Sequence, residues 1–180
     1  TVRTVCTATK MQTCSPAGKA MSCCTARQVP TGCPISAASG AVTVNLAGAT
    51  ATGADGADTL TSIENVVRSG FADNLTGDSN NNWLEGLARN DTLNGGAGTD
   101  AFIFDAGSGV DVIYNYASGQ GDKIHLKSGL NGSGITSAAQ ALASVTDVGG
   151  NATVNLAGGN TITLVGVTTA SLSASDFVIF

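Results

Sequence analysis

A step of nine residues organises the middle of this chain. Between residues 53 and 103, five nine-residue units place Asp or Asn at the sixth position and a large apolar residue at the eighth, with a six-residue insertion after the first unit. The sixth positions are Asp58, Asp73, Asn82, Asp91 and Asp100, and the eighth positions are Leu60, Leu75, Leu84, Leu93 and Phe102. A flexible glycine-rich linker would not keep this phase over five units, so the period predicts a repeat architecture.

The composition of each unit predicts a parallel solenoid, and the expected fold class is all-β. The triplet around the eighth position can form one short strand, and the preceding Gly, Asn and Asp residues suit tight turns. Two units then make one coil with a strand on each side, and the eighth-position side chains stack inward. Because every second turn shares an edge, Asp73 is expected beside Asp91 and Asn82 beside Asp100.

The stacked carboxylates predict a metal site. They repel one another unless a cation lies between them. Carboxylate and backbone carbonyl oxygens together form a hard, flexible ligand set, which favours calcium over magnesium or zinc. The alternative is a solenoid rich in Gly and Asn whose turns hold no metal.

One unit matches a known pattern in full. Residues 95–103, Gly-Gly-Ala-Gly-Thr-Asp-Ala-Phe-Ile, fit G-G-x-G-x-D-x-U-x, so the chain resembles the RTX, or haemolysin-type, calcium-binding repeat proteins. The resemblance implies a calcium-filled parallel β-roll in a bacterial protein exported by type I secretion. The expected metal-binding residues are Asp58, Asp73, Asn82, Asp91, Gly95, Gly96, Gly98, Asp100 and Asp111.

The other units depart from the pattern. Leu87 and Arg89 stand where the family has Gly, so that turn is expected to be strained or altered. Asn82 is a neutral and weaker ligand than Asp, and Arg68 replaces the first Gly of its unit. Two or three good calcium sites are therefore expected, and not a full series.

Residues 1–34 have a different composition from the rest of the chain. They contain all five Cys and no acidic residue, and their net charge is +4. Because the whole chain has a net charge of −5, residues 35–180 carry a net charge of −9. A disulfide module would leave one thiol over, and a zinc site lacks both a C-x-x-C pair and a His. A third hypothesis is a frameshift near residue 35, because a shifted reading of degenerate codons permits the repeat-like text G-G-K-G-D-V-L. On that hypothesis the segment is non-native; a genuine Cys-rich module is the alternative.

The remaining boundaries follow from the loss of the period. Residues 35–52 form a lead-in strand region, 53–103 the calcium-binding β-roll, and 104–180 a C-terminal capping and secretion-signal domain that is rich in β-structure. The strand predicted at 41–46 alternates apolar and polar residues, with Val42, Val44 and Leu46 on one face. Further elements are expected as strands at 112–113 and 123–126, a helix at 136–145, a hairpin from 152–156 and 161–165, and a final strand at 175–180.

The sequence contains neither a zinc-protease motif nor a serine-hydrolase motif. It has no H-E-x-x-H or G-x-S-x-G motif and a single His, His125, which fits a structural role in a strand, so no enzyme activity is expected. The net charge of −5 argues against nucleic acid as a partner. No apolar run is long enough to span a bilayer, and no N-terminal signal-peptide pattern is present.

The expected function is calcium-triggered folding outside the cell. Calcium would fold a secreted, extracellular chain after export, and the type I secretion apparatus and an upstream catalytic or adhesive domain are the expected partners. A binding module is the rival class: an extracellular adhesin or polysaccharide-binding module, in which Trp83 could stack on sugars. A third possibility is the tail of a secreted protease, lipase or epimerase.

Overall fold

The computed structural model describes residues 33–34, 38–54, 56–60, 63–67, 69–105, 107 and 109–180. The hypotheses on residues 1–34 therefore lie outside the described residues, apart from the backbone of one short strand, and so does Arg68. The strands are β1 (Cys33–Pro34), β2 (Val42–Asn45), β3 (Thr50–Gly53), β4 (Gly56–Thr59), β5 (Asn65–Val67), β6 (Asn74–Thr76), β7 (Trp83–Glu85), β8 (Thr92–Asn94), β9 (Ala101–Phe104), β10 (Val110–Tyr114), β11 (Lys123–Leu126), β12 (Val145–Val148), β13 (Asn151–Asn155), β14 (Thr161–Leu164) and β15 (Phe177–Ile179). The helices are α1 (Ala138–Ala143) and the 3-10 turns η1 (Ser118–Gln120), η2 (Leu130–Gly132), η3 (Ala157–Gly159), η4 (Thr169–Ser171) and η5 (Ala174–Asp176).

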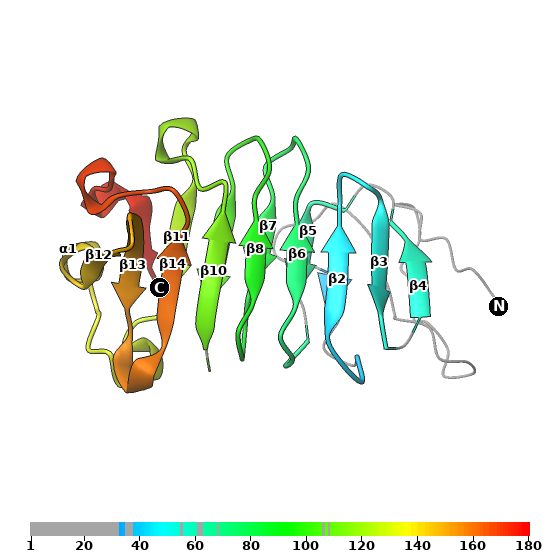
Figure 1. The fold of residues 1–180 in the computed structure, drawn as a ribbon, viewed down its shortest axis with the longest axis horizontal. Coiled ribbons are helices and arrows are strands. Elements are labelled where there is room, and N and C mark those ends of the chain that lie inside the picture. Colours follow the sequence, from blue (N-terminus) through cyan, green and yellow to red (C-terminus); the bar gives the residue numbers. More distant parts are fainter. Residues whose placement is uncertain are drawn as a thin grey trace.

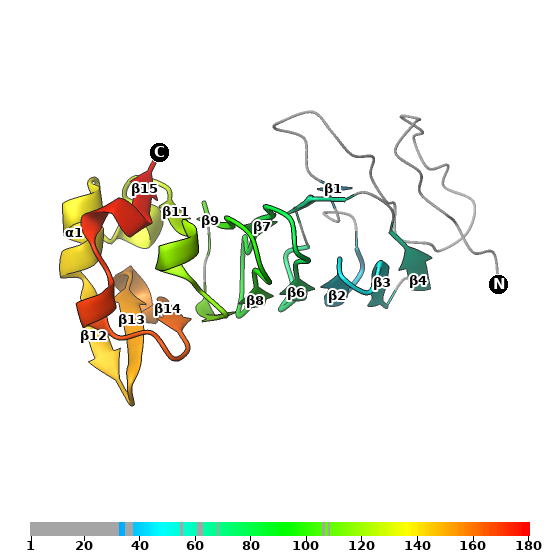
Figure 2. The same ribbon diagram turned by 90° about the horizontal axis from the view of Figure 1, so that it is seen from above.

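The strands form two sheets that face each other as layers (Figure 2). From β5 to β11 the chain alternates between a six-stranded sheet, in the order β1-β5-β7-β9-β11-β15, and a nine-stranded sheet, in the order β12-β13-β14-β10-β8-β6-β2-β3-β4. The pairings of β6 with β8 and of β7 with β9 are parallel, as are those of β8 with β10 and of β9 with β11. The predicted all-β parallel roll is therefore confirmed.

The eighth-position side chains fill the space between the sheets. Leu75 lies opposite Leu93 in the nine-stranded sheet, and Leu84 lies opposite Phe102 in the six-stranded sheet. All four are 0% exposed, because the second residue of each of these strands faces inward. Each coil thus buries the apolar side chains of the next, as a solenoid requires.

The first nine-residue unit folds differently from the others. Strands β3 and β4 pair antiparallel and extend the nine-stranded sheet beyond β2 (Figure 1). Asp58 consequently lies inside strand β4, opposite Ala51, and not in a turn of the roll. Only two residues separate β3 from β4, which suits a tight hairpin and cannot carry the chain across to the other sheet.

The roll continues past residue 103, where the strict period ends. Strand β10 pairs parallel with both β8 and β14, and β11 pairs parallel with both β9 and β15. Longer turns absorb the irregular spacing.

The C-terminal elements close this end of the roll. The hairpin expected there is formed by the antiparallel strands β13 and β14. Helix α1 begins after Ser137, whose side chain accepts a hydrogen bond from the Gln140 N–H, and packs beside η5 and β15. No helix in the described part of the chain has the length and apolar character needed to cross a membrane.

Candidate calcium-binding turns

The chain crosses between the sheets at two edges of the roll. The first edge, uppermost in Figure 1, contains the turns at residues 77–82, 95–100 and 115–122, which lead from the nine-stranded to the six-stranded sheet. The second edge contains the turns that lead back, two of which end at Asp73 and Asp91, while Asp111 is the second residue of β10. The sixth-position side chains are therefore sorted onto two separate edges.

On the first edge, the carboxylates of Asp100 and Asp122 each accept a hydrogen bond from the backbone of the coil before. The Asn82 N–H donates to Asp100 Oδ1 at 2.8 Å, and the Asp100 N–H donates to Asp122 Oδ1 at 2.9 Å. Asn82 thus lies beside Asp100, as the period predicts.

The second edge repeats this arrangement. Val42 N–H donates to Asp73 Oδ1, Asp73 N–H to Asp91 Oδ1, and Asp91 N–H to Asp111 Oδ1, each at 2.8 Å. The side chains of Asp73, Asp91 and Asp111 are buried. We call the two series together the Asp/Asn ladder, or simply the ladder. It consists of Asp73, Asp91 and Asp111 on one edge, and Asn82, Asp100 and Asp122 on the other.

Sequence reasoning missed Asp122. It follows Asp100 by 22 residues, whereas Asp100 follows Asn82 by 18, so a fixed step does not reach it. A local signal was nevertheless present. Asp122 is followed two residues later by the buried Ile124, just as Asp100 is followed by the buried Phe102. A search for Asp-x-apolar triplets with variable turn length would have found it.

Asp100 is the ladder residue whose environment most clearly calls for a cation. It is 1% exposed, and its Oδ2 is buried without a hydrogen-bond partner among the described residues. Burial raises the pKa of this carboxyl to about 6; the hydrogen bond from the Asn82 amide opposes the shift, and the carboxylates of Asp122 and Asp78 add to it. A bound cation would remove both the desolvation cost and the repulsion.

Glycines bring the turns at 77–82 and 95–100 into close contact. A Cβ on Gly95 would lie 2.3 Å from Asp100 Oδ2, and a Cβ on Gly77 would lie 2.1 Å from the Gly95 carbonyl oxygen. Such distances exclude any side chain. The absence of a Cβ leaves the Asp100 carboxylate and the Gly95 carbonyl in a narrow space between the two turns.

Gly96 and Gly98 allow the carbonyl oxygens of Asp78 and Asn80 in the neighbouring turn to approach closely. They adopt φ of +91° and +113°, which side-chain-bearing residues rarely adopt. A Cβ on Gly96 would lie 2.1 Å from the Asp78 carbonyl oxygen, and one on Gly98 would lie 2.6 Å from that of Asn80. The predicted residues Gly95, Gly96, Gly98, Asn82 and Asp100 therefore come together on this edge.

These donors fit calcium and do not fit a softer metal. No three His, Cys, Asp or Glu side chains gather at one point within the described ranges, so backbone and amide oxygens must complete any site. Calcium accepts six to eight such oxygens in flexible geometry, whereas magnesium requires a strict octahedron and zinc prefers nitrogen and sulfur. Asp100, the Asn82 side-chain oxygen and the carbonyls of residues 78, 80 and 95 would hold the ion. Its positive charge would balance the buried carboxylate.

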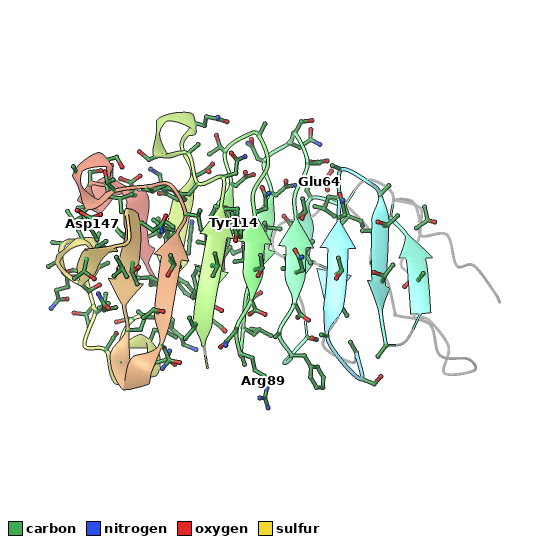
Figure 3. All side chains as sticks on the ribbon, in the orientation of Figure 1. Glu64, Arg89, Tyr114 and Asp147 are labelled. Atoms are coloured by element: carbon green, nitrogen blue, oxygen red, sulfur yellow. The ribbon has the colours of Figure 1, made fainter. Side chains whose placement is uncertain are left out.

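On the second edge, the hydroxyl and N–H of Ser69 bind the Asp73 carboxylate and so supply part of the stabilisation that a cation would give. The Ser69 hydroxyl lies 2.9 and 2.8 Å from the two Asp73 carboxylate oxygens, and the Ser69 N–H donates to Oδ2 at 3.1 Å. Leu87 and Arg89 adopt φ of +34° and +77° in the turn that ends at Asp91, where the repeat pattern has Gly. Of the two expected outcomes, a strained or an altered turn, the positive φ values of Leu87 and Arg89 correspond to strain. Arg89 extends outward at the lower edge in Figure 3.

Asp58 does not join either series. It lies 6% exposed in β4, where burial raises the pKa of its carboxyl and its Oδ2 makes no hydrogen bond to a described residue. Asp111 belongs to the second edge, as the hydrogen bond from Asp91 places it. The period therefore places Asp73, Asn82, Asp91 and Asp100 in the ladder, whereas Asp111 and Asp122 lie outside the nine-residue step and Asp58 lies outside the ladder.

His125 and Trp83 pack against each other on the six-stranded sheet. Their ring centroids are 5.5 Å apart, and burial lowers the pKa of His125, so its imidazole is neutral near pH 7. This is the environment of a structural histidine. Trp83 is half-buried by the contact, which leaves it a reduced surface for other partners.

Comparison with known families agrees with this geometry. The model of the RTX calcium-binding nonapeptide repeat, in four copies, matches residues 76–113. The match begins at the end of β6 and ends within β10, so it includes the close pair of turns on the first edge. No curated protein matches the chain. Residues 76–113 are therefore RTX calcium-binding nonapeptide repeats, and they form the central coils of the parallel β-roll.

Proposed function

We propose that calcium binding on the first edge drives the folding of the roll. The observation that carries this proposal is the buried Oδ2 of Asp100, which has no hydrogen-bond partner in the described structure and lies near the carboxylates of Asp78 and Asp122. In the absence of a cation, folding must bury this charge without compensation, which costs free energy. Calcium reverses the sign of that contribution.

The short strands make this dependence on calcium stronger. Strands β6, β7 and β8 have three residues each and bury one large side chain apiece. The intervening turns are rich in Gly and Asn, which lose much conformational entropy when they become ordered. Binding free energy thereby becomes folding free energy, as in other small metal-dependent domains.

The proposed biological role is export of a larger exoprotein by type I secretion, with folding after release. Free calcium is scarce in the cytosol and abundant outside, so the chain would stay unfolded in the cell and fold in the extracellular medium. The role is structural and involves no catalysis: the Asp residues recur as ladder positions, which accounts for them without a reaction. The RTX repeats at 76–113 support this proposal.

Circular dichroism of the full chain during a calcium titration tests the folding step. We expect a cooperative gain of β signal with calcium, reversal by chelator, and no transition with magnesium. Asp100→Asn should raise the calcium midpoint about tenfold or more, equivalent to the loss of about 1.4 kcal/mol. Asp147→Asn removes the same charge from the exposed strand β12. The new amide can still accept the Thr169 N–H and can donate to the Thr169 hydroxyl, so the midpoint should change much less than in Asp100→Asn. A chain that is fully folded in chelator and does not respond to calcium would contradict the proposal.

Export is tested separately. A passenger protein fused ahead of the full chain should appear in the medium only when a type I transporter is co-expressed. Deletion of residues 173–180, which include β15, should keep the passenger in the cell. A passenger that stays in the cell with the intact chain and an active transporter would contradict the export role, and would leave calcium-driven folding unaffected.

A further inference from the structure

A groove of about 620 Å³ follows the first edge on the side of the nine-stranded sheet. It extends across the ends of β2, β6, β8 and β10, and so across several coils. The lining residues are Leu46, Ala47, Thr76, Gly77, Asp78, Ser79, Asn94, Gly96 and Asn115. None of them is basic or aromatic, and one is acidic.

Two neutral amide side chains of the groove, those of Asn94 and Asn115, are held in place by hydrogen bonds to the backbone of Gly96. Asn94 Oδ1 accepts a hydrogen bond from the Gly96 N–H at 3.1 Å, and the Asn115 side-chain amide donates to the Gly96 carbonyl oxygen. The amide nitrogen of Asn94 and the amide oxygen of Asn115 make no hydrogen bond to a described residue. The groove thus offers one oriented donor and one oriented acceptor to a ligand, in addition to the hydroxyls of Thr76 and Ser79.

An aromatic ring extends the groove onto the outer face of the sheet. Asn45, Thr76, Asn94 and Tyr114 lie opposite one another on successive strands. Because their neighbours Leu75, Leu93 and Ile113 face inward, this row faces outward. Tyr114 is 45% exposed and stands at the front of β10 in Figure 3. The row contains no charged side chain, so it ends in a flat apolar surface beside neutral amides and hydroxyls.

We propose that this groove and Tyr114 form a binding site for a neutral glycan. The ring of Tyr114 packs against the C–H face of a sugar, while Asn94, Asn115 and Thr76 bind its hydroxyls, each of which both donates and accepts. Asp78 in the groove disfavours phosphates, uronic acids and nucleic acids, because no basic side chain compensates its charge. The length of the groove across four strands suits several sugar units of a polymer.

Titration calorimetry of the full chain in calcium tests the site. The probes are the neutral hexasaccharides of glucose, mannose and xylose, with hexagalacturonate as the anionic comparison. At least one neutral probe should bind in the millimolar range or tighter, and hexagalacturonate should not. Failure of every neutral probe, or preference for the anionic probe, would overturn the proposal.

Variants locate the binding. Tyr114→Ala should weaken the affinity about tenfold or more, a loss of about 1.4 kcal/mol, whereas Tyr114→Phe should retain it. Phe71→Ala is the matched control, because Phe71 is a similarly exposed aromatic residue, 40% exposed, that precedes Asp73 in a turn of the second edge. Unchanged circular dichroism in calcium shows that each variant folds. Equal affinity of the Tyr114→Ala variant and the unaltered chain would overturn the assignment.

A chelator separates this proposal from calcium-driven folding. Gly77, Asp78 and Gly96 belong both to the groove and to the turns of the candidate calcium site, so unfolding in chelator should abolish glycan binding. Glycan binding that persists in chelator, by a chain that stays folded, would support the glycan site and reject the folding switch.

Discussion

The two carboxylate oxygens of Asp100 and of Asp122 have different surroundings, and the two residues differ in the partner of Oδ2. Oδ1 of Asp100 and of Asp122 accepts a backbone N–H from the preceding coil. Oδ2 of Asp122 accepts the Ala117 N–H at 2.9 Å, whereas Oδ2 of Asp100 makes no hydrogen bond to a described residue. Backbone N–H groups therefore supply hydrogen bonds to both oxygens of Asp122, whereas Oδ2 of Asp100 is available to a calcium ion.

Acid should partly replace calcium at Asp100. Its folded-state pKa of about 6 lies above the usual 3.8, so the folded state holds the proton more tightly. The stability that protonation provides is present below pH 3.8 and is lost as the pH rises to about 6. In chelator with sucrose, which favours the compact state, the β signal should therefore increase as the pH falls from 7 to 5. The Asp100→Asn variant should show a smaller increase; an equal increase would assign the effect to other groups.

Asp122→Asn should reduce stability without removing a calcium ion. The amide nitrogen would face a backbone N–H of Asp100 or Ala117, which leaves one buried donor without an acceptor. The expected loss is about 1–3 kcal/mol of unfolding free energy in saturating calcium. Urea denaturation measures this loss, and calorimetry should give the calcium stoichiometry of the unaltered chain. A reduced stoichiometry would instead identify Asp122 as a calcium ligand.

At the scale of the elements, the close pair of turns depends on residues without side chains. Gly77 and Gly95 allow backbone of one coil to lie directly against the next. The turn that contains Leu87 and Arg89 achieves a related shape with positive φ in residues that disfavour it. The two edges of the roll therefore differ in backbone strain as well as in their partners.

Gly77→Ala should destabilise the roll strongly. The new Cβ would meet the Gly95 carbonyl oxygen at 2.1 Å and Asn82 Oδ1 at 2.3 Å, and backbone cannot move aside at low cost. We expect a loss of about 1–3 kcal/mol or more in calcium-saturated urea denaturation. Gly119→Ala is the control, because nothing lies within 4 Å of its added Cβ, and it should change stability by less than about 0.5 kcal/mol. Equal effects of the two substitutions would refute the close approach of the turns.

The sequence predicted the elements whose signals are local. The nine-residue period places β6 to β9 and their inward side chains, and local patterns place α1 and the β13–β14 hairpin. The antiparallel pairing of β3 and β4 was missed because the first unit has the same composition as the others, and the partner of a strand depends on distant residues. Asp122 was missed because lengthened turns preserve the coil while they destroy the period.

At the scale of the whole molecule, one tyrosine joins the roll to its C-terminal cap. The Tyr116 hydroxyl lies 3.0 Å from both the Asp122 carbonyl oxygen and Asp176 Oδ1, and its ring packs on Phe102. Asp176 Oδ2 in turn accepts hydrogen bonds from the N–H and hydroxyl of Ser173. Burial, followed by the Asp176 charge, raises the pKa of Tyr116, so the phenol stays a donor at all working pH values. The end of the ladder and the capping segment are thus held by one shared group.

Tyr116→Phe should loosen the cap and, through it, the roll. The substitution keeps the ring and leaves the Asp176 carboxylate with one donor fewer, at an expected cost of about 1–3 kcal/mol. Because binding and folding are coupled, the calcium midpoint should rise as the unfolding free energy falls. Hydrogen exchange of β15 and β11 should increase first. If the midpoint did not change while β15 became exposed, the cap would be independent of the roll.

The ladder also determines how the roll would respond to a pulling force. Between Asp73 and Asp122, its hydrogen bonds join each coil to the next, 18 to 22 residues further along the chain, so a pull between the two ends of the roll loads them one coil at a time. Each ruptured coil would release about 60 to 75 Å of chain, at about 3.4 Å per residue. Optical tweezers should record a staircase of such steps in calcium, with the highest rupture force where the turns at 77–82 and 95–100 separate. The protein would then behave as a tether that lengthens in discrete increments under load, and calcium would set the force at which it begins to yield.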